Sequence, residues 1–358
     1  MGFRICYLGD ARSIHVKRWI DWFSKRHETY LITYHEPEIL RGYENLYYMP
    51  IGKGPLRYLR FLNFVRWSKS VISKIKPDII HAHYVVNYGL CGAYSGFHPF
   101  VLFPWGDDIS VFPEVSPLHR FYVVEIMKRA DAIIGYEDEV ERINALLGEE
   151  KGRVVRDGID VDLFKPADAK RKGGKIRILN LRKSEGDYHT EVLVKAIPLV
   201  TKVYDDVEFV MLRAGKEFSK LYELAKELGV LKYIKFVEPM PNERVPELMR
   251  SCDIYVDTFF RRVPGSGLGK TGLEAMSCGM AVVVSNTSGI GTYVKDGENG
   301  LIYRGLDPSS LAEALIRLIE DEKLREALGR RARKHVVGNY NIEDCMRTAE
   351  SLYEELLA

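Results

Sequence analysis

The part of the sequence best suited to chemistry is a glycine-rich segment that carries one lysine and one glutamate. It runs from Pro264 to Met276 and reads PGSGLGKTGLEAM. Bare glycines let a backbone approach a ligand closely, and the free amide groups at the start of the following helix favour an anion. The segment is therefore expected to hold a phosphate group. The residues expected to form this cradle are Gly267, Leu268, Gly269, Lys270 and Thr271.

Three kinds of phosphate ligand fit this segment to different degrees. The ending GKT suits a P-loop, but the first glycine of that motif would fall on Pro264. The letters GLGKTG from Gly267 match a dinucleotide fingerprint, yet they follow a late strand, whereas that fingerprint belongs to the first βα turn of its domain. The third candidate ligand is a nucleoside diphosphate. Glu274 would accept hydrogen bonds from its ribose while the loop holds its diphosphate.

The elements that must position these residues follow a regular alternation. Short runs rich in Val, Ile, Phe and Tyr alternate with longer helical patterns, which indicates parallel sheets covered by helices. The predicted strands lie at residues 4–9, 29–34, 78–83, 100–105, 132–136, 153–156, 176–181, 208–212, 234–237, 253–258 and 281–285. Beyond Leu306 the pattern is helical, with one helix opening at Asp307 and another covering 342–357.

A polar segment with Pro and Gly, residues 165–175, separates two runs of this alternation, and we place a domain boundary there. The 358 residues then form two doubly wound α/β domains, 1–166 and 167–340, and the helix at 341–358 is expected to pack back on the first. Ligands of such sheets bind at the carboxyl ends of the strands, so two domains facing each other would form a cleft.

Composition excludes several broad classes of protein. The 52 Lys and Arg residues against 50 Asp and Glu give a net charge of +2, which favours neither disorder nor nucleic-acid binding. No run of 18 apolar residues occurs and the first nine residues read as a strand, so we expect a cytoplasmic protein. The five cysteines lack disulfide or zinc spacing. The sequence has no glutamine, a thermolabile residue, which suggests a thermophilic source.

Several segments, in the right order along nearly the whole chain, resemble one enzyme family. Residues 267–279 are similar to the G-F-G-L-x-x-L-E-A-M-A-C-G signature of the retaining glycosyltransferases of GT-B fold, in the large fourth family (glycosyl transferases group 1). Residues 154–166, 178–183 and 299–301 resemble the family's V-x-N-G-I-D-x-x-x-F-x-P, V-G-R-L and D-G-x-N-G-L segments. The resemblance implies two Rossmann-like domains facing across a cleft.

The resemblance also implies that the second domain binds a nucleoside-diphosphate sugar, UDP- or GDP-linked, and that no cofactor is needed. By motif match, the Gly267–Thr271 loop would face the diphosphate, Glu274 the ribose, and the backbone of Val237 and Glu238 the base. Either Arg182 or Lys183 would neutralise the departing diphosphate, and Glu274 completes the candidate catalytic set.

Two positions depart from the family pattern. Ser266 stands where relatives carry the first Glu of an E-x7-E pair, near the donor sugar, so a hydroxyl replaces an anion there. Tyr188 stands in place of the family's second cation, and Lys270 is expected to compensate for it.

The first domain would bind the acceptor, a sugar or a lipid-linked molecule. Its candidate residues are Gly9, Asp10, Arg12, His15, His83, Trp105, Asp107 and Asp108. Trp105 replaces a family His that touches the donor sugar; a sugar ring could pack on it, and a core Trp is the comparable alternative. Strand alternation is expected to send only one of His81 and His83 into the cleft.

No metal site is expected. His81 and His83 lack a third ligand nearby, and Asp160-Val161-Asp162, although it reads D-x-D, lies inside the family segment before the linker. The expected reaction is metal-independent transfer of a hexose to an acceptor hydroxyl, with retention and with the departing phosphate as base. The first alternative is a non-catalytic sugar-nucleotide-binding protein. A more distant alternative is a P-loop or dinucleotide enzyme built on Gly269 and Lys270.

A basic segment bears on the acceptor. Residues 53–76 contain seven Lys and Arg residues, no acidic residue and several aromatics. Such a helix could lie on an anionic membrane, at the inner face, and reach a lipid-linked acceptor. The spacing of Leu59, Leu62, Ile72 and Ile75 favours the other interpretation, a core helix with a solvated basic face.

Overall fold

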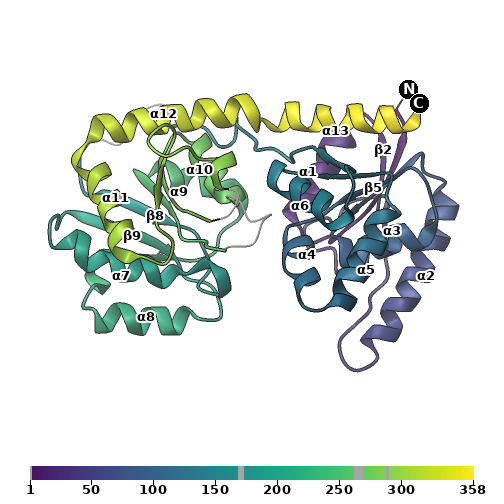
Figure 1. Cartoon of the computed structure of the whole chain (residues 1–358), viewed down its shortest axis with the longest axis horizontal. Coiled ribbons are helices and arrows are strands. Elements are labelled where there is room, and N and C mark those ends of the chain that lie inside the picture. The colour runs from purple at the N-terminus through teal and green to yellow at the C-terminus, as the bar shows by residue number, and fades with distance from the viewer. Residues whose placement is uncertain (1, 168–172, 262–268, 288–289) are drawn as a thin grey trace. The chain divides into compact units, whose positions relative to one another are not determined.

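The computed structural model describes residues 2–167, 173–261, 269–287 and 290–358, which form two compact units (Figure 1). Unit 1 contains residues 1–157 and 344–358, and unit 2 contains residues 158–343. The sequence placed the boundary later, at residue 166. The residues just before it belong to unit 2 because Phe164 is fully buried there and its carbonyl oxygen accepts a hydrogen bond from the Ser277 hydroxyl at 2.6 Å.

Unit 1 is built on a parallel sheet of seven strands in the order β3-β2-β1-β4-β5-β6-β7. The strands are β1 (Arg4–Leu8), β2 (Glu28–Thr33), β3 (Leu46–Tyr48), β4 (Ile79–His83), β5 (Phe100–Phe103), β6 (Ala132–Gly135) and β7 (Gly152–Val154). The α-helices are α1 (Ile14–Phe23), α2 (Arg57–Ile75), α3 (Leu90–Ser95), α4 (Asp107–Ser110), α5 (Pro117–Lys128) and α6 (Glu137–Leu147), together with the last helix, α13 (Ile342–Leu357).

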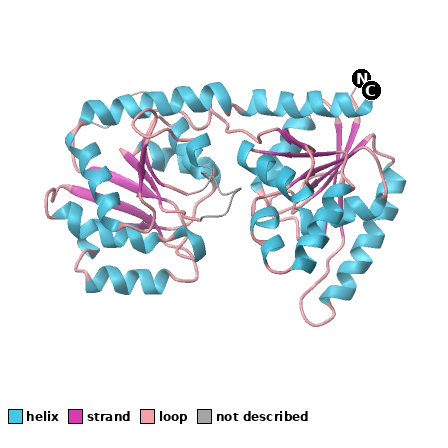
Figure 2. Cartoon of the chain, viewed as in Figure 1, coloured by secondary structure: helices cyan, strands magenta, loops and turns pink. Residues whose placement is uncertain are grey.

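Unit 2 repeats this plan with a parallel sheet of six strands in the order β10-β9-β8-β11-β12-β13. The strands are β8 (Ile176–Asn180), β9 (Val207–Leu212), β10 (Ile234–Val237), β11 (Ile254–Asp257), β12 (Ala281–Ser285) and β13 (Leu301–Tyr303). The helices are α7 (Thr190–Thr201), α8 (Phe218–Glu227), α9 (Val245–Arg250), α10 (Lys270–Ser277), α11 (Pro308–Glu320) and α12 (Glu322–Asn339). In each unit the strands lie between helices (Figure 2).

These sheets confirm the predicted α/β class and the doubly wound arrangement. Each predicted strand overlaps an observed one, whereas β3 and β13 were not predicted. Both are edge strands of three residues, too short to show an alternation of apolar and polar side chains. Asp307 caps α11 as expected, since its carboxylate accepts the amide N–H groups of Ser309 and Ser310.

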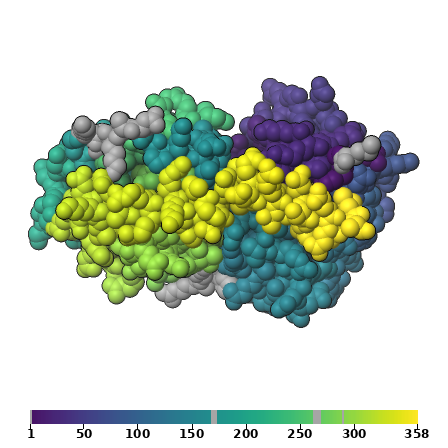
Figure 3. All heavy atoms as spheres, turned by 90° about the horizontal axis from the view of Figure 1, so that it is seen from above, coloured from purple at the N-terminus to yellow at the C-terminus, as the bar shows by residue number. Residues whose placement is uncertain are grey.

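Helix α13 packs on unit 1, which contains the other end of the chain (Figure 3). Tyr353 is fully buried, its ring lies 6.2 Å from that of Phe3, and its hydroxyl group is hydrogen-bonded to His81 Nδ1. Glu350 contacts His27 Nε2 at 2.7 Å. Among the described residues, no helix is both long and apolar enough to span a membrane.

Candidate functional site

Each sheet has one point at which its strand order reverses, and ligands of doubly wound sheets bind there, beyond the carboxyl ends of the strands. In unit 2 this point lies between β8 and β11, which are followed by Arg182 and closed by Asp257. In unit 1 it lies between β1 and β4, which are followed by Gly9 and closed by His83. Predicted site residues thus occupy the switch point of both sheets.

In unit 2, Arg182 and Asp257 form a salt bridge across the switch point. Arg182 Nε and its terminal NH2 group donate to the two Asp257 carboxylate oxygens at 2.9 and 2.5 Å. The side chains are only 12% and 3% exposed. Burial alone would lower the pKa of Arg182, but the Asp257 carboxylate holds it above the usual value. Asp257 therefore fixes the Arg182 guanidinium group in bidentate geometry and partly balances its positive charge.

The guanidinium group of Arg182 lies directly against the start of α10. Gly269 is the residue before this helix, and a Cβ atom added there would meet the Arg182 guanidinium nitrogens at 2.5 and 2.8 Å. Gly269 has an ordinary φ of −62°, so glycine is required here for the close approach of a side chain rather than for an unusual backbone. The arginine thus lies beside the amide groups that begin α10.

The sequence left open whether Arg182 or Lys183 would neutralise the diphosphate, and the two residues have different surroundings in the structure. Lys183 is exposed, whereas Arg182 is held by Asp257 and lies 5.3 Å from the centre of the Tyr188 ring. Tyr188, predicted to stand in place of the family's second cation, contacts Arg182 with its ring face, a cation–π arrangement.

The remaining predicted donor residues are placed as follows. Glu274 is 5% exposed in the second turn of α10, and Thr271 lies in its first turn, half-buried. The ammonium group of Lys270 donates a hydrogen bond to the carbonyl oxygen of Gly158 at 2.7 Å, a contact that the sequence did not suggest. The predictions for Ser266, Gly267 and Leu268 lie outside the described residues.

The residues predicted to face the base lie at the same edge of the sheet but not at the switch point. Val237 ends β10, the outermost strand, which β9 separates from β8. Glu238 follows it, is exposed, and contacts Arg213 at 3.2 Å.

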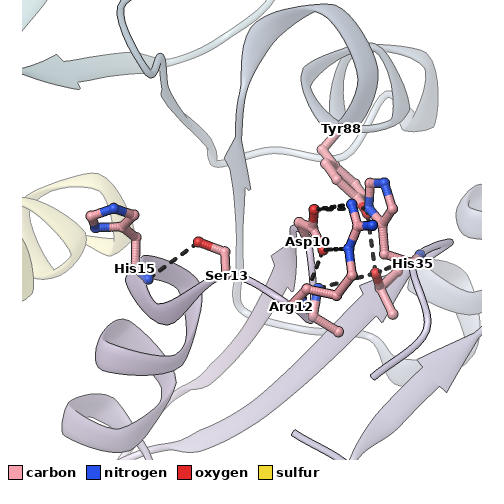
Figure 4. A network of polar contacts seen from close by, with 8 residues as sticks. Asp10, Arg12, Ser13, His15, His35 and Tyr88 are labelled. Atoms are coloured by element: carbon pink, nitrogen blue, oxygen red, sulfur yellow. Dashed lines mark hydrogen bonds and ion pairs between the residues drawn. The ribbon is translucent and has the colours of Figure 1, made fainter. Parts of the chain in front are cut away.

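In unit 1, the loop after β1 forms a polar network that includes two residues the sequence did not single out (Figure 4). Asp10 accepts hydrogen bonds from the backbone amide, Nε and NH2 groups of Arg12 at 2.9, 3.0 and 2.8 Å. His35, which follows β2, lies 3.3 Å from the Asp10 carboxylate and 2.9 Å from the Tyr88 hydroxyl. Only the fold brings these four residues together, because β2 pairs with β1.

The charged groups of this network are Arg12 and Asp10, which form an ion pair at 2.8 Å. Partial burial raises the pKa of Asp10, but the hydrogen bonds from Arg12 outweigh it and keep that pKa below its usual value. Burial lowers the pKa of His35 to about 4, so its ring is neutral at pH 7. The side chain of Arg12 is 45% exposed, and it is the cation that this edge presents to a ligand.

His15 does not belong to this network. It begins α1 on the far side of Ser13, whose hydroxyl accepts its backbone amide at 3.2 Å (Figure 4). Its ring lies 5.5 Å from the ring of Trp105 and its Nδ1 lies 3.5 Å from Asp157. Trp105 is partly buried beside it, so it is intermediate between a sugar-binding surface ring and a core Trp.

Of the two carboxylates after Trp105, Asp107 is exposed and Asp108 is fully buried. Asp108 accepts the amide N–H groups of Val85 and Trp105 at 2.7 and 2.9 Å. Burial raises its pKa to about 6 even though these hydrogen bonds lower it. Asp108 therefore holds two loops in place, and the expectation that it binds a sugar hydroxyl is not supported by its burial.

Strand alternation, which was expected to send only one of His81 and His83 into the cleft, does not separate them. Their rings stack with centroids 4.5 Å apart, because residues two apart on a strand share a face. His83 is 1% exposed, contacts the ring of Trp105 at 5.9 Å, and neither of its ring nitrogens has a hydrogen-bond partner among the described residues. Burial lowers its pKa to about 3.

This buried neutral ring makes the stability depend on pH. The pKa of His83 is about 3 in the folded chain and 6.5 ordinarily, so the folded state binds fewer protons between these values. The contribution of the neutral His83 ring to the free energy of unfolding is complete above pH 6.5 and is lost as the pH falls toward 3. The stability difference between the wild type and His83→Leu should shrink by about 1.4 kcal/mol for each pH unit below 6.5.

Thermal or urea unfolding followed across this range measures that difference. The comparison cancels contributions from groups common to both proteins, Asp108 among them. His98→Leu removes a ring that is 57% exposed and contacts Asp131 at 2.7 Å, so it shows whether the slope is particular to the buried ring. A difference that stays constant between neutral pH and pH 4 would contradict the prediction.

The D-x-D sequence takes part in local structure. Asp160 Oδ1 accepts the amide N–H groups of Asp162 and Leu163 at 3.2 and 2.9 Å, which closes a turn.

The family model described as "Glycosyl transferases group 1" matches residues 163–335, and the model described as "Glycosyl transferase 4-like" matches residues 4–136. This chain is a group 1 glycosyltransferase. The two models divide the chain as the two sheets do, and the first contains Arg182, Gly269 and Glu274.

Two curated relatives illustrate the range of this group. An uncharacterized glycosyltransferase of Methanocaldococcus jannaschii is 26% identical over 82% of this chain and 80% of its own. A D-inositol 3-phosphate glycosyltransferase of Corynebacterium jeikeium is 29% identical over 57% of this chain, and the match spans only 52% of its length.

Among solved structures, Anabaena HepE in complex with UDP and glucose superposes with a TM-score of 0.80 over 98% of this chain and 100% of that chain, at 19% identity. This likeness, together with the two parallel-sheet units, shows that the glycosyltransferase has the GT-B fold.

Proposed function

We propose that this group 1 glycosyltransferase moves a hexose from a UDP- or GDP-linked sugar to an acceptor hydroxyl, with retention at the anomeric carbon and without a metal ion. The observation that carries the proposal is the Arg182–Asp257 pair, a fixed cation at the switch point of the unit 2 sheet and against the start of α10. The complex of the Anabaena neighbour with UDP and glucose supports the choice of donor.

The charges of unit 2 suit the departure of a diphosphate. In the proposed step the bond from the anomeric carbon to the diphosphate oxygen breaks, a bond to the acceptor oxygen forms on the same face, and the acceptor proton passes to the departing phosphate oxygen. The negative charge that grows on the diphosphate would be stabilised by Arg182, by exposed Lys183 and by the amide groups at the start of α10. Glu274 would hold the ribose hydroxyls.

Unit 1 would bind the acceptor at the network after β1. Arg12 is oriented by Asp10 and exposed, so it suits an acceptor that carries hydroxyl or phosphate groups. The name of the Corynebacterium relative, which specifies an inositol phosphate, is in line with such an acceptor. A lipid-linked sugar at the inner face of the membrane is the other acceptor that we propose, because residues 53–76 are basic.

A panel of donors tests the proposal. Thermal unfolding should shift upward with a UDP- or GDP-sugar and not with ATP or NAD, and incubation with an acceptor should release the nucleoside diphosphate. The anomeric configuration of the product, read by NMR, tests retention, and EDTA should leave the rate unchanged. Binding without any turnover would favour a non-catalytic binding protein, and stabilisation by ATP or NAD alone would favour the other nucleotide-binding classes.

A further inference from the structure

Helix α2 is longer than the sheet on which it packs. Its 19 residues span about 28 Å, whereas the five residues of β4 span about 17 Å. The helix ends close to the start of β4 in sequence, so the excess length lies at its own beginning, beyond the carboxyl ends of the strands. The buried side chains of α2 accordingly begin at Phe64, and residues 52–60 are all exposed.

This overhang corrects the expectation of a core helix along the whole segment. Ile72 and Ile75 are buried as expected, but Leu59 and Leu62 are 59% and 49% exposed. Sequence spacing alone could not show which of these residues are exposed, because both ends of the helix carry apolar residues. Only the length of the neighbouring strands decides which end packs on the sheet. We refer to Leu56, Tyr58, Leu59 and Leu62, all exposed, as the α2 cluster.

The outer face of α2 changes character along the helix. Leu59, Leu62, Arg66 and Lys69 follow at intervals of three and four residues and so share one face, turned away from the buried face. Arg66 lies about 10 Å further along the axis than Leu59. The outward face is therefore apolar where the helix projects beyond the sheet and basic one to two turns later.

The basic residues of this segment are all exposed. They are Lys53, Arg57, Arg60, Arg66, Lys69, Lys74 and Lys76. None of them forms an ion pair within the part of the chain that the structure describes. Two acidic side chains near this edge pair with other cations, since Glu36 lies 3.8 Å from Arg41 and Glu114 pairs with Arg142. Glu38 and Asp107 are also exposed, and Glu38 forms no ion pair with the basic residues of this segment among the residues that the structure describes. The positive charge is thus left to attract an anionic partner.

A second exposed apolar group lies at the start of α5. Val115, Leu118 and Phe121 are 62%, 73% and 63% exposed, and we call them the α5 cluster. The sequence analysis did not single them out. Helix α5 ends just before β6, as α2 ends before β4, so both helices begin toward the carboxyl edge of the same sheet (Figure 1). Several exposed apolar side chains at one helix start mark an interaction surface.

We propose that this edge of unit 1 docks on an anionic phospholipid bilayer. The α2 and α5 clusters would enter the boundary between headgroups and acyl chains, at a depth of about 5 to 10 Å, while Arg66 and Lys69 contact lipid phosphates. A bilayer suits these clusters because they lie at two separate helix starts and are flanked by exposed cations that form no ion pair among the described residues. Lys69 contacts the ring of Tyr94, at 5.4 Å, and a deformable anionic surface can contact all of these cations together. Tyr58, with an apolar ring and a polar tip, suits the interface.

The inference deepens the proposed function, because a membrane-bound acceptor would then meet the edge of unit 1 that carries Arg12. The test of membrane binding needs neither donor nor turnover. Membrane binding can therefore be refuted while the proposed glycosyl transfer is supported, and the reverse is equally possible.

Vesicle sedimentation provides the test. The full chain should sediment with vesicles of phosphatidylcholine and phosphatidylglycerol at low salt and far less with pure phosphatidylcholine. Arg66→Glu with Lys69→Glu should weaken binding to the anionic vesicles roughly 30-fold or more, at about 1 kcal/mol for each lost basic residue. Leu118→Ser with Phe121→Ser, and separately Leu59→Ser with Leu62→Ser, should remove the binding that persists at high salt.

Matched variants in unit 2 control for the changes themselves. Lys220→Glu with Lys226→Glu makes the same charge change on α8, and Leu199→Ser with Val203→Ser removes two exposed apolar side chains. Both should bind like the wild type. Absence of salt-sensitive binding, or equal binding by all variants, would overturn the proposal. Self-association that the serine variants abolish, without any vesicle binding, would also overturn it and assign the clusters to a second copy of the chain.

Discussion

Arg182→Ala is expected to lower kcat/KM for the nucleoside-diphosphate sugar by roughly 10²- to 10³-fold. The substitution removes a cation beside the start of α10 and leaves the Asp257 carboxylate, which is 3% exposed, without its partner. An unpaired anion at this point would repel the diphosphate and would also destabilise unit 2 by about 3 to 5 kcal/mol. Steady-state kinetics and urea unfolding measure the two effects separately.

The double variant Arg182→Ala with Asp257→Ala separates the two roles of the arginine. It removes the unpaired charge, so unit 2 should regain much of its stability, but the diphosphate still lacks its cation and transfer should remain slow. Arg330→Ala, which removes a surface arginine of α12 paired with Glu326 at 3.5 Å, is the control. Recovery of full activity in the double variant would show that Arg182 serves only to balance Asp257.

Glu274→Ala is expected to lower kcat/KM for a ribose-containing donor by roughly 10- to 150-fold, which is the loss of a charged hydrogen bond worth about 1.5 to 3 kcal/mol. Glu274 is 5% exposed in the second turn of α10, close to the amide groups that would hold the diphosphate. Glu274→Gln keeps an oxygen that accepts hydrogen bonds and should fall between the wild type and alanine.

A donor that lacks the 2′-hydroxyl of the ribose makes this prediction specific. The wild type should discriminate strongly between the ribose and deoxyribose donors, and Glu274→Ala should treat them alike, because the carboxylate that distinguishes them is gone. Glu313→Ala, an exposed position on α11, is the control, and thermal unfolding checks that α10 is still folded. A variant that is slow yet keeps the full discrimination would remove Glu274 from the ribose site.

Much of the fold could be predicted from local patterns. The runs of β-branched and aromatic residues predicted the long strands, and Asp307 before Pro308 predicted the start of α11, because both signals depend on neighbours in the sequence. The segment from Gly269 to Glu274 predicted a strand-to-helix turn suited to an anion, and α10 begins there. The edge strands β3 and β13, of three residues each, left too short a pattern to be recognised.

The partners of the charged residues could not be predicted in this way. Arg182 and Lys183 were equivalent by sequence, and only the pairing of β8 with β11 places Asp257, 75 residues away, against the first and not the second. Lys270 was expected near phosphate, and its contact with Gly158 spans 112 residues. His35 and Tyr88 joined the network of Asp10 through the neighbouring strand and a loop, without any sequence motif.

The amino-acid sequence by itself determined the order and type of the main elements, the family and the glycine-rich turn, because periodicity, capping and backbone freedom act over a few residues. The tertiary structure alone decided which charges are paired and which apolar residues stay exposed. Leu59 and Ile72 have the same character in sequence, but one overhangs a sheet of short strands and the other packs on it. Burial and ion pairing depend on what distant segments bring alongside, and that is set by strand pairing and by the relative lengths of the elements.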